Sequence, residues 1–439
     1  MEQRESFRKF FQYTTLSVLG TLGVSCYILA DTFFVSKGLG TNGLAALNLA
    51  IPVYNFIHGT GLMLGMGGAT RFCICKSQGR KEEVNQIYTN TIYLAVLFSA
   101  VFVLLGLLSG ERLSLLLGAD ENVREMTNTY LFWLLLFSPA FILNDVLLCF
   151  VRNDDSPRLA MTAMIIGSLS NILLDYIFIF PMKMGIFGAV FATGSSPVIS
   201  IVLMLSHWIK GKNTFHFCRT RMKAYIVSQE LALGFPSLIA QLSSGIVMIT
   251  FNAIILKLEG NTGVAAYGVI ANISLVVVAV YTGVAQGVQP LISYFYGKND
   301  KKQVKSMLRY SIQTILAISL LVYLFVFIFA QPVASVFNSE NNLELQRIAV
   351  DGLKIYFTSS IFVGYNIVLA IFFTSVERPL PAHILSILRG LVLIVPMAFL
   401  LSAIGGMTGV WLTYPITEAA VALLGYVVYK HGIWSLKVS

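Results

Sequence analysis

Long apolar runs fill most of this chain, and short polar segments that carry the charged residues separate them. A helix rises about 1.5 Å per residue, so roughly 20 apolar residues cross the hydrocarbon core of a bilayer. The pattern therefore predicts an all-α polytopic membrane protein with twelve transmembrane helices. Their predicted ranges are 11–36, 44–75, 87–108, 127–150, 158–180, 188–209, 230–258, 264–295, 305–330, 347–374, 381–402 and 409–430.

The composition strengthens the membrane interpretation and excludes several functions. Of the 439 residues, 56% are hydrophobic and only 12% are charged, whereas soluble domains carry about 25% charged residues. The net charge of +9 does not indicate nucleic-acid binding, because the basic residues lie in short loops. No phosphate loop or nucleophile elbow occurs, so we expect no enzyme and no cofactor. Uphill transport would then depend on an ion gradient.

Lysine and arginine are concentrated in alternate loops, which predicts the orientation in the membrane. The loops at 76–81, 210–223 and 298–309 are rich in basic residues, whereas the loops on the opposite side hold few. The positive-inside rule therefore places both termini in the cytoplasm. We expect a monomeric, multi-pass protein of the plasma (inner) membrane, with the lipid bilayer as its surroundings.

The chain also repeats itself. Matching positions in the two halves at a nearly constant displacement include Gly40 and Gly260, Gly43 and Gly263, Asn144 and Asn366, and Pro157 and Pro379. This predicts two six-helix lobes related by a parallel pseudo-two-fold repeat, as in transporters that rock one half against the other. The predicted lobes are 1–210 and 230–439, joined by a basic cytoplasmic linker at 211–229.

Four polar residues fall at similar depths in the predicted N-terminal lobe: Asp31 in the first span, Asn171 and Asp175 in the fifth, and Thr193 in the sixth. Intramembrane carboxylates are costly and mark functional sites. Two carboxylates in one apolar site favour binding of one proton or one monovalent cation. Their oxygens suit H⁺ or Na⁺, so these residues are the candidate cation site. The alternative is that they face separate packing interfaces.

Three further polar residues in the apolar spans are tentative members of a substrate cavity. Glu418 lies near the middle of the twelfth span and either contacts a cationic substrate or pairs with Arg389 or Gln286. Gln286 itself lies in the eighth span. His58, in the second span, is either a hydrogen-bonded packing residue or a proton carrier, since its unperturbed pKa lies near neutrality.

Several motifs together resemble the multidrug and toxic compound extrusion (MATE) family, in its bacterial multidrug efflux branch. They are Asp31-Thr-Phe-Phe-Val-Ser with the segment 38–47, Asn171-Ile-Leu-Leu-Asp175, Gly188-Ala-Val-Phe-Ala-Thr193, and the segment 286–297. The resemblance spans nearly the whole chain. It implies a two-lobed antiporter that expels small organic cations, with Asp31, Asn171, Asp175 and Thr193 as its cation site. One departure is Asp155, where the family usually has glycine.

Two other functions remain open at this point. A lipid or lipid-linked oligosaccharide flippase of the same superfamily would need a cationic cavity, but Arg71, Lys354 and Arg389 are scattered along the chain. An uncoupled channel or receptor is disfavoured by the parallel repeat and by the paired carboxylates. The sequence therefore favours an antiporter that exchanges drugs for protons or sodium ions by rocker-switch alternating access.

Overall fold

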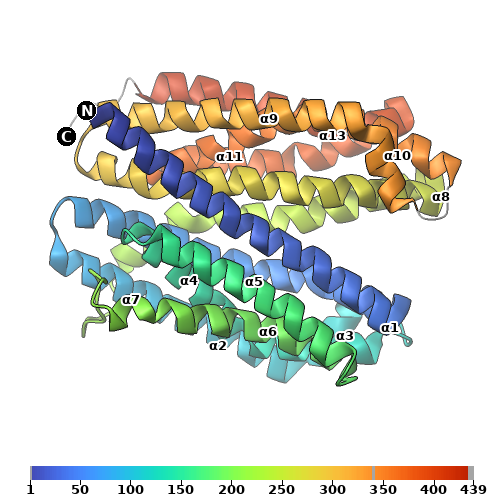
Figure 1. Ribbon diagram of the computed structural model, residues 1–439, viewed down its shortest axis with the longest axis horizontal. Helices are drawn as coiled ribbons and strands as arrows, with labels where there is room; N and C mark the ends of the chain where they lie inside the picture. Colours follow the sequence, from blue (N-terminus) through green and yellow to red (C-terminus); the bar gives the residue numbers. More distant parts are fainter. Residues whose placement is uncertain (1, 339–341, 434–439) are drawn as a thin grey trace.

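The computed structural model describes residues 2–338 and 342–433, which are almost entirely helical (Figure 1). No strand occurs among these residues. The helices are α1 (Glu2–Ser77), α2 (Lys81–Leu116), α3 (Arg124–Leu136), α4 (Ser138–Asn153), α5 (Pro157–Ile179), α6 (Gly185–Met204), α7 (Ser206–Ile209), α8 (Ala224–Gly297), α9 (Lys301–Phe337), α10 (Leu343–Tyr356), a 3₁₀ turn (Phe357–Ser359), α11 (Ser360–Ser375), α12 (Pro379–Ile387), a π-helical turn (Leu388–Val392) and α13 (Ile394–Ile433).

The number of continuous helices differs from the number of predicted spans. Within the described ranges, eight helices are long and apolar enough to cross a membrane, and the bent pair α3 and α4 makes a ninth, with a bend of 48°. The difference arises because α1, α8 and the continuous segment from α12 to α13 each contain two predicted spans. A glycine with positive φ interrupts each of them, at Gly40 (φ 70°), Gly260 (φ 59°) and Gly406 (φ 55°). Counting each side of these glycines as a crossing gives the predicted twelve.

The backbone repeats between the two halves of the chain at the positions that the sequence repeat aligns. Gly40 has φ/ψ of 70°/−160° and Gly260 has 59°/−152°, a combination open essentially to glycine alone. Asp155 (φ 57°) and Glu377 (φ 54°) match in the same way, in the loops after α4 and α11. The glycine that the family usually has at Asp155 is thus replaced by an acidic residue that keeps the left-handed backbone.

Two groups of helices lie on either side of α1 and α8. Figure 1 shows α2 to α7 in one group and α9 to α13 in the other, with α1 crossing diagonally between them. The chain starts α1 and finishes α13 at the same end of the molecule. The first turn of α1 contacts the second group, where the rings of Phe7 and Tyr310 have centroids 5.2 Å apart. The lobe boundaries at 210 and 230 stay a prediction.

The segment between α7 and α8 is fastened to α2 by its backbone. The N–H groups of His216 and Lys223 donate to the side-chain oxygens of Asn85 and Asn90, at 2.8 and 2.9 Å. Because α8 begins at Ala224, the last residues of the predicted linker 211–229 are helical. This segment therefore packs along the first group of helices and is not an unattached linker between the halves.

Candidate functional site

The four predicted cation-site residues meet in one buried cluster, which we call the carboxylate cluster. Asp31 comes from α1 shortly before Gly40, Asn171 and Asp175 from α5, and Thr193 from α6. Asn171 and Asp175 are fully buried, and Asp31 and Thr193 are 7% and 3% exposed. Asn171 and Asp175 are four residues apart, so the helix turns both toward the same neighbours.

Hydrogen bonds connect the members of the carboxylate cluster. With the amide of Asn171 oriented to suit its neighbours, its nitrogen donates to Asp175 Oδ2 at 3.0 Å and its oxygen accepts from the Thr193 N–H at 3.3 Å. The carboxyl groups of Asp31 and Asp175 lie within hydrogen-bonding reach of each other. A hydrogen bond between two carboxyl groups requires a proton on one of them. The second oxygen of each, Oδ1, has no hydrogen-bond partner.

Tyr130 lies at this cluster, and a hydrogen-bonded tyrosine pair starts one helical turn before Asp31; the sequence interpretation missed all three tyrosines. Tyr130 on α3 is 2% exposed, and its hydroxyl lies within hydrogen-bonding reach of Thr193. The Thr193 hydroxyl donates to the Ala189 carbonyl at 3.0 Å, so its oxygen is free to accept from Tyr130. The hydroxyls of Tyr27 and Tyr54 hydrogen-bond each other. Tyr27 lies one helical turn before Asp31, a spacing that could have identified it.

The donor set of the carboxylate cluster is compatible with a proton or a small hard cation. Two carboxylates, an amide and a hydroxyl supply oxygen ligands, which hard cations prefer. Among the described residues, no three His, Cys, Asp or Glu side chains group closely enough to hold a metal ion. A sodium ion at this cluster would therefore need Asn171 and Thr193 in addition to the two carboxylates.

His58 makes a hydrogen-bonded pair with an acidic residue on α4. Its Nδ1 lies 2.9 Å from Asp145 Oδ2, and the His58 side chain is 19% exposed. The rings of Tyr54 and His58 have centroids 4.5 Å apart. His58 therefore has a specific hydrogen-bond partner, Asp145, as expected for a packing residue. Its role in the substrate cavity or as a proton carrier stays a prediction.

Glu418 pairs with Arg389, which is one of the two alternatives that the sequence left open. Arg389 Nη2 and Nε donate to Glu418 Oε1 at 2.9 and 3.1 Å, and Asn366 Nδ2 donates to Oε2 at 2.7 Å. Arg389 lies in the π-helical turn Leu388–Val392, a feature that often occurs at functional sites. Because Glu418 is 1% exposed, a cationic substrate could reach its carboxylate only by displacing Arg389.

Gln286 lies in a polar layer between α8 and the helices of the first group. Its Oε1 accepts from Arg152 Nη1 at 3.0 Å. One turn further, the Gln289 side chain accepts from Asn153 and donates to Thr70, at 2.9 and 3.1 Å. An ion pair between Arg71 on α1 and Glu377 lies in the same region. These contacts hold the two halves together near the basic loops, and a cavity role for Gln286 stays a prediction.

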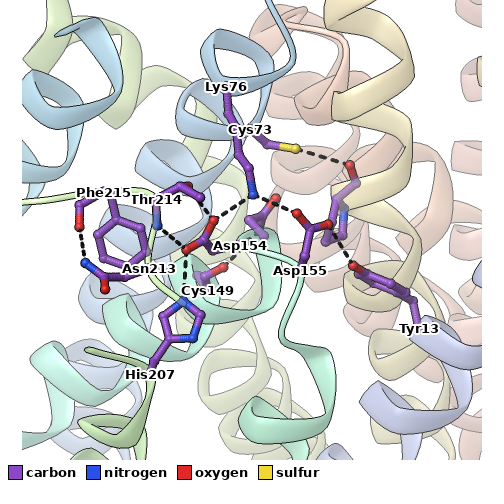
Figure 2. Close-up of polar contacts among 12 residues, drawn as sticks. Tyr13, Cys73, Lys76, Cys149, Asp154, Asp155, His207, Asn213, Thr214 and Phe215 are labelled. Atoms are coloured by element: carbon purple, nitrogen blue, oxygen red, sulfur yellow. Dashed lines mark hydrogen bonds and ion pairs between the residues drawn. The ribbon is translucent and has the colours of Figure 1, made fainter. Parts of the chain in front are cut away.

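A second cluster of charged residues closes the same end of the first group of helices (Figure 2). We call it the loop cluster: Lys76, Asp154, Asp155, His207 and Thr214. Lys76 Nζ lies 2.6 Å from Asp154 Oδ1 and 2.7 Å from Asp155 Oδ2, and His207 Nε2 lies 2.9 Å from Asp154 Oδ2. Burial alone would raise the pKa of Asp154, but hydrogen bonds from His207, Lys76 and Thr214 lower it to about 2.

Comparisons with known proteins agree with this architecture. The family model described as MatE matches residues 17–177 and 236–400. The multidrug export protein MepA of Staphylococcus saprophyticus is 25% identical over 426 residues, covering 96% of this chain and 93% of MepA. MepA of Staphylococcus aureus is 24% identical over the same shares of the two chains.

Solved structures share the fold. An outward-facing multidrug resistance MATE transporter of the MOP superfamily superimposes with a TM-score of 0.92, 24% identity, and coverage of 98% of this chain and 96% of that chain. A MOP superfamily transporter from Pyrococcus furiosus also gives a TM-score of 0.92 at 24% identity, covering 99% and 97%.

Proposed function

Because the chain belongs to the MatE family of membrane transporters, we propose that it exports small organic cations in exchange for protons or sodium ions. The carboxylate cluster carries this proposal: two carboxyl groups share a buried site, and each keeps one unpartnered oxygen. Such a site gains stability from one bound proton or one monovalent cation. The family relatives named multidrug export proteins support drugs as the substrate.

The basic residues inside the apolar spans argue against the flippase alternative. Arg71 is paired with Glu377, and Arg389 is paired with Glu418. Lys354 Nζ lies over an aromatic ring, 5.3 Å from its centroid. A pyrophosphate head group needs several unpaired cations that converge on one cavity. The pairing of these arginines therefore favours a cationic substrate over an anionic one.

The proposed mechanism couples the carboxylate cluster to motion of the two halves. The contacts of Arg71, Arg152 and Asn153 with the second half hold the end with the basic loops closed. In this state a cation enters the carboxylate cluster from the opposite side, and its binding weakens the binding of the drug. By linkage, drug and cation weaken each other's binding to the same extent. Release of the drug and rocking of the halves then deliver the cation to the cytoplasm.

The same proposal includes the location, orientation and oligomeric state of the protein in the membrane. The segments 76–81 and 298–309, both rich in basic residues, lie at the end where α1 begins and α13 ends. The positive-inside rule then orients both termini to the cytoplasm of a plasma (inner) membrane. Each carboxylate-cluster residue belongs to this one chain, so a monomer contains a whole site.

Efflux from proteoliposomes tests the proposal. Ethidium efflux is measured with a pH gradient alone and with a sodium gradient alone, for the unaltered protein, Asp31→Asn and Asp175→Asn. We expect one gradient to drive efflux by the unaltered protein. Each substitution keeps the shape of the side chain but removes the charge, so we expect at least a hundredfold loss of driven efflux, with normal insertion into the membrane.

The outcomes distinguish the two ions and the competing functions. Drive by a pH gradient assigns a proton to the carboxylate cluster, and drive by a sodium gradient assigns sodium. Full driven efflux by both variants would falsify the site. No drive by either ion in the unaltered protein would remove the organic cation as substrate and favour the flippase.

A further inference from the structure

A polar cavity opens beside the loop cluster at the end of the molecule that carries the basic loops. It has a volume of about 410 Å³, within the range of pockets that bind small ligands. The residues that line it come from the start of α1, the start of α5 and the segment around α7. They include Gln12, Ser156, Arg158, His207, Lys210 and Lys212.

Three unpaired basic side chains make this cavity positive. Arg158, Lys210 and Lys212 are exposed, and none of them forms an ion pair within the described residues. The acidic residue that lines the cavity, Asp155, already lies 2.7 Å from Lys76 Nζ. The cavity therefore carries a positive charge that no side chain of the described chain neutralises.

The start of α5 adds the positive end of a helix dipole to the cavity. Ser156 is the N-cap of this helix, and its side chain makes no capping hydrogen bond. Pro157 has no N–H. The N–H groups of Leu159 and Ala160 donate to the Ser156 carbonyl at 3.1 and 3.2 Å. The first turn therefore offers an anion the N–H of Arg158 and the positive dipole end of a 23-residue helix.

A buried histidine adds a polar atom without a hydrogen-bond partner to this cavity. His207 is 1% exposed, and Figure 2 shows one of its ring nitrogens turned toward Asp154. Asp154 is ionised, because its hydrogen bonds lower its pKa to about 2, so His207 Nε2 must donate to it. The other nitrogen, Nδ1, has no hydrogen-bond partner. With Nε2–H donated to Asp154, Nδ1 is left as a polar atom without a partner in the wall of the cavity.

We propose that this cavity binds the phosphate of an acidic phospholipid head group from the cytoplasmic leaflet. Exposed apolar side chains next to the lining residues in the sequence favour a lipid over a soluble phosphate. Phe11 beside Gln12 is 62% exposed, and Leu205 and Ile209 beside His207 are 46% and 84% exposed. Acyl chains can lie on these apolar side chains while the head group enters the polar cavity. Basic pockets on the cytoplasmic side of other membrane proteins bind anionic head groups in this way. The proposal does not depend on the coupling ion or on the exported substrate.

Native mass spectrometry of the detergent-purified full-length protein tests this proposal. The protein is titrated with dioleoylphosphatidylglycerol, with dioleoylphosphatidylcholine, and with phosphatidylglycerol in the presence of inorganic phosphate. The variants are Lys210→Gln/Lys212→Gln and, separately, Arg158→Gln. The matched control is Lys302→Gln/Lys305→Gln, which removes the same charge from exposed positions on α9.

We expect phosphatidylglycerol to bind at least tenfold more tightly than phosphatidylcholine. Each basic residue near an anionic membrane surface contributes about a fivefold gain in affinity, so the Lys210 and Lys212 double variant should lose about tenfold or more. Arg158→Gln should lose several-fold, and the α9 control should match the unaltered protein.

Two results would overturn the proposal. An equal loss in the α9 control would show that binding reflects diffuse surface charge. Displacement of the lipid by millimolar inorganic phosphate would make a soluble anion the ligand. Because all the substituted side chains are exposed, the variants should fold, and any loss of lipid binding then reports on the cavity itself.

Discussion

The two halves of the chain share a backbone plan, but the carboxylate cluster in one half and Glu418 in the other differ in how their buried negative charge is compensated. In the N-terminal half, Asp31 and Asp175 meet each other, and each retains an oxygen without a hydrogen-bond partner. In the C-terminal half, Glu418 receives two hydrogen bonds from Arg389 and one from Asn366. One buried site is therefore short of positive charge, and the other already contains it.

This difference indicates which half can take part in ion coupling. A buried carboxylate that already has an arginine gains little from an added proton or sodium ion, because the arginine has neutralised it. Two carboxylates without a basic partner gain much more. The two halves thus repeat the backbone while these two buried acidic sites differ, and we propose a cation site at the carboxylate cluster alone.

The largest effect on stability should come from removing one member of the fixed ion pair. Arg389→Met leaves the Glu418 carboxylate, which is 1% exposed, without its cation. Loss of one partner of a buried pair costs about 3 to 5 kcal/mol. Thermal unfolding in detergent should therefore show a strong drop in the midpoint for this variant.

The double variant Arg389→Met/Glu418→Gln is the decisive control. It removes both charges, so most of the stability should return, and driven efflux should remain, since the pair plays no part in coupling. If the double variant is stable but no longer performs driven efflux, the C-terminal half also takes part in coupling, and the contrast between the halves is wrong.

Much of the fold could be predicted because membrane burial constrains sequence strongly. Apolar runs fix the helices, and the aligned glycines reveal the repeat: Gly40 and Gly260 share a backbone conformation that excludes side chains. The sequence could not show that two successive helices in α1, α8 and α13 join directly at a glycine with positive φ, because a glycine in a short loop and a glycine in a sharp kink look alike in sequence.

The candidate site was predictable only where helix spacing and depth sufficed. Asn171 and Asp175 share a helical face by spacing, and topology places Asp31 and Thr193 at their depth. Tyr130 was missed because a tyrosine in an apolar span usually packs against lipid or other helices. The pairing of Glu418 depended on side-chain direction, and the structure places Arg389 Nη2 2.9 Å from its carboxylate, while contact with a substrate stays a prediction.

The shared backbone plan predicts equal responses at matching glycines. A Cβ at Gly40 or Gly260 would meet no atom within 4 Å, so alanine there costs only backbone strain. Their φ/ψ region is essentially restricted to glycine, and we expect Gly40→Ala and Gly260→Ala each to lose about 2 to 3 kcal/mol. Chemical denaturation in detergent measures both losses.

Gly268→Ala is the matched control for these two variants. It also has open space around its Cβ but lacks a positive φ, so alanine should be neutral or slightly stabilising in this helix. A loss at Gly40 without a comparable loss at Gly260 would show that the two kinks are not equivalent.

The smallest effect concerns a carboxylate that only the N-terminal half has. Asp155 corresponds to Glu377 in the repeat, so Asp154 corresponds to Val376. The pKa of Asp154 is lowered from 3.8 to about 2 in the folded protein, which corresponds to about 2 kcal/mol at 1.36 kcal/mol per unit. A lowered folded pKa gives stability that is fully present above about pH 4 and is lost as the pH falls toward 2.

Hydrogen exchange followed by mass spectrometry between pH 5 and pH 2 can locate this loss. After correction for the intrinsic exchange rate, protection around α4 and α7 should fall as the pH falls. Protection around α11 and α12 should not depend on the protonation of Asp154. Asp154→Asn should remove the pH dependence around α4 and α7, and Asp351→Asn, at an exposed position on α10, should leave it intact. Loss of protection in both halves at the same pH would mean that the halves unfold as one unit, and the contrast drawn from Asp154 would then fail.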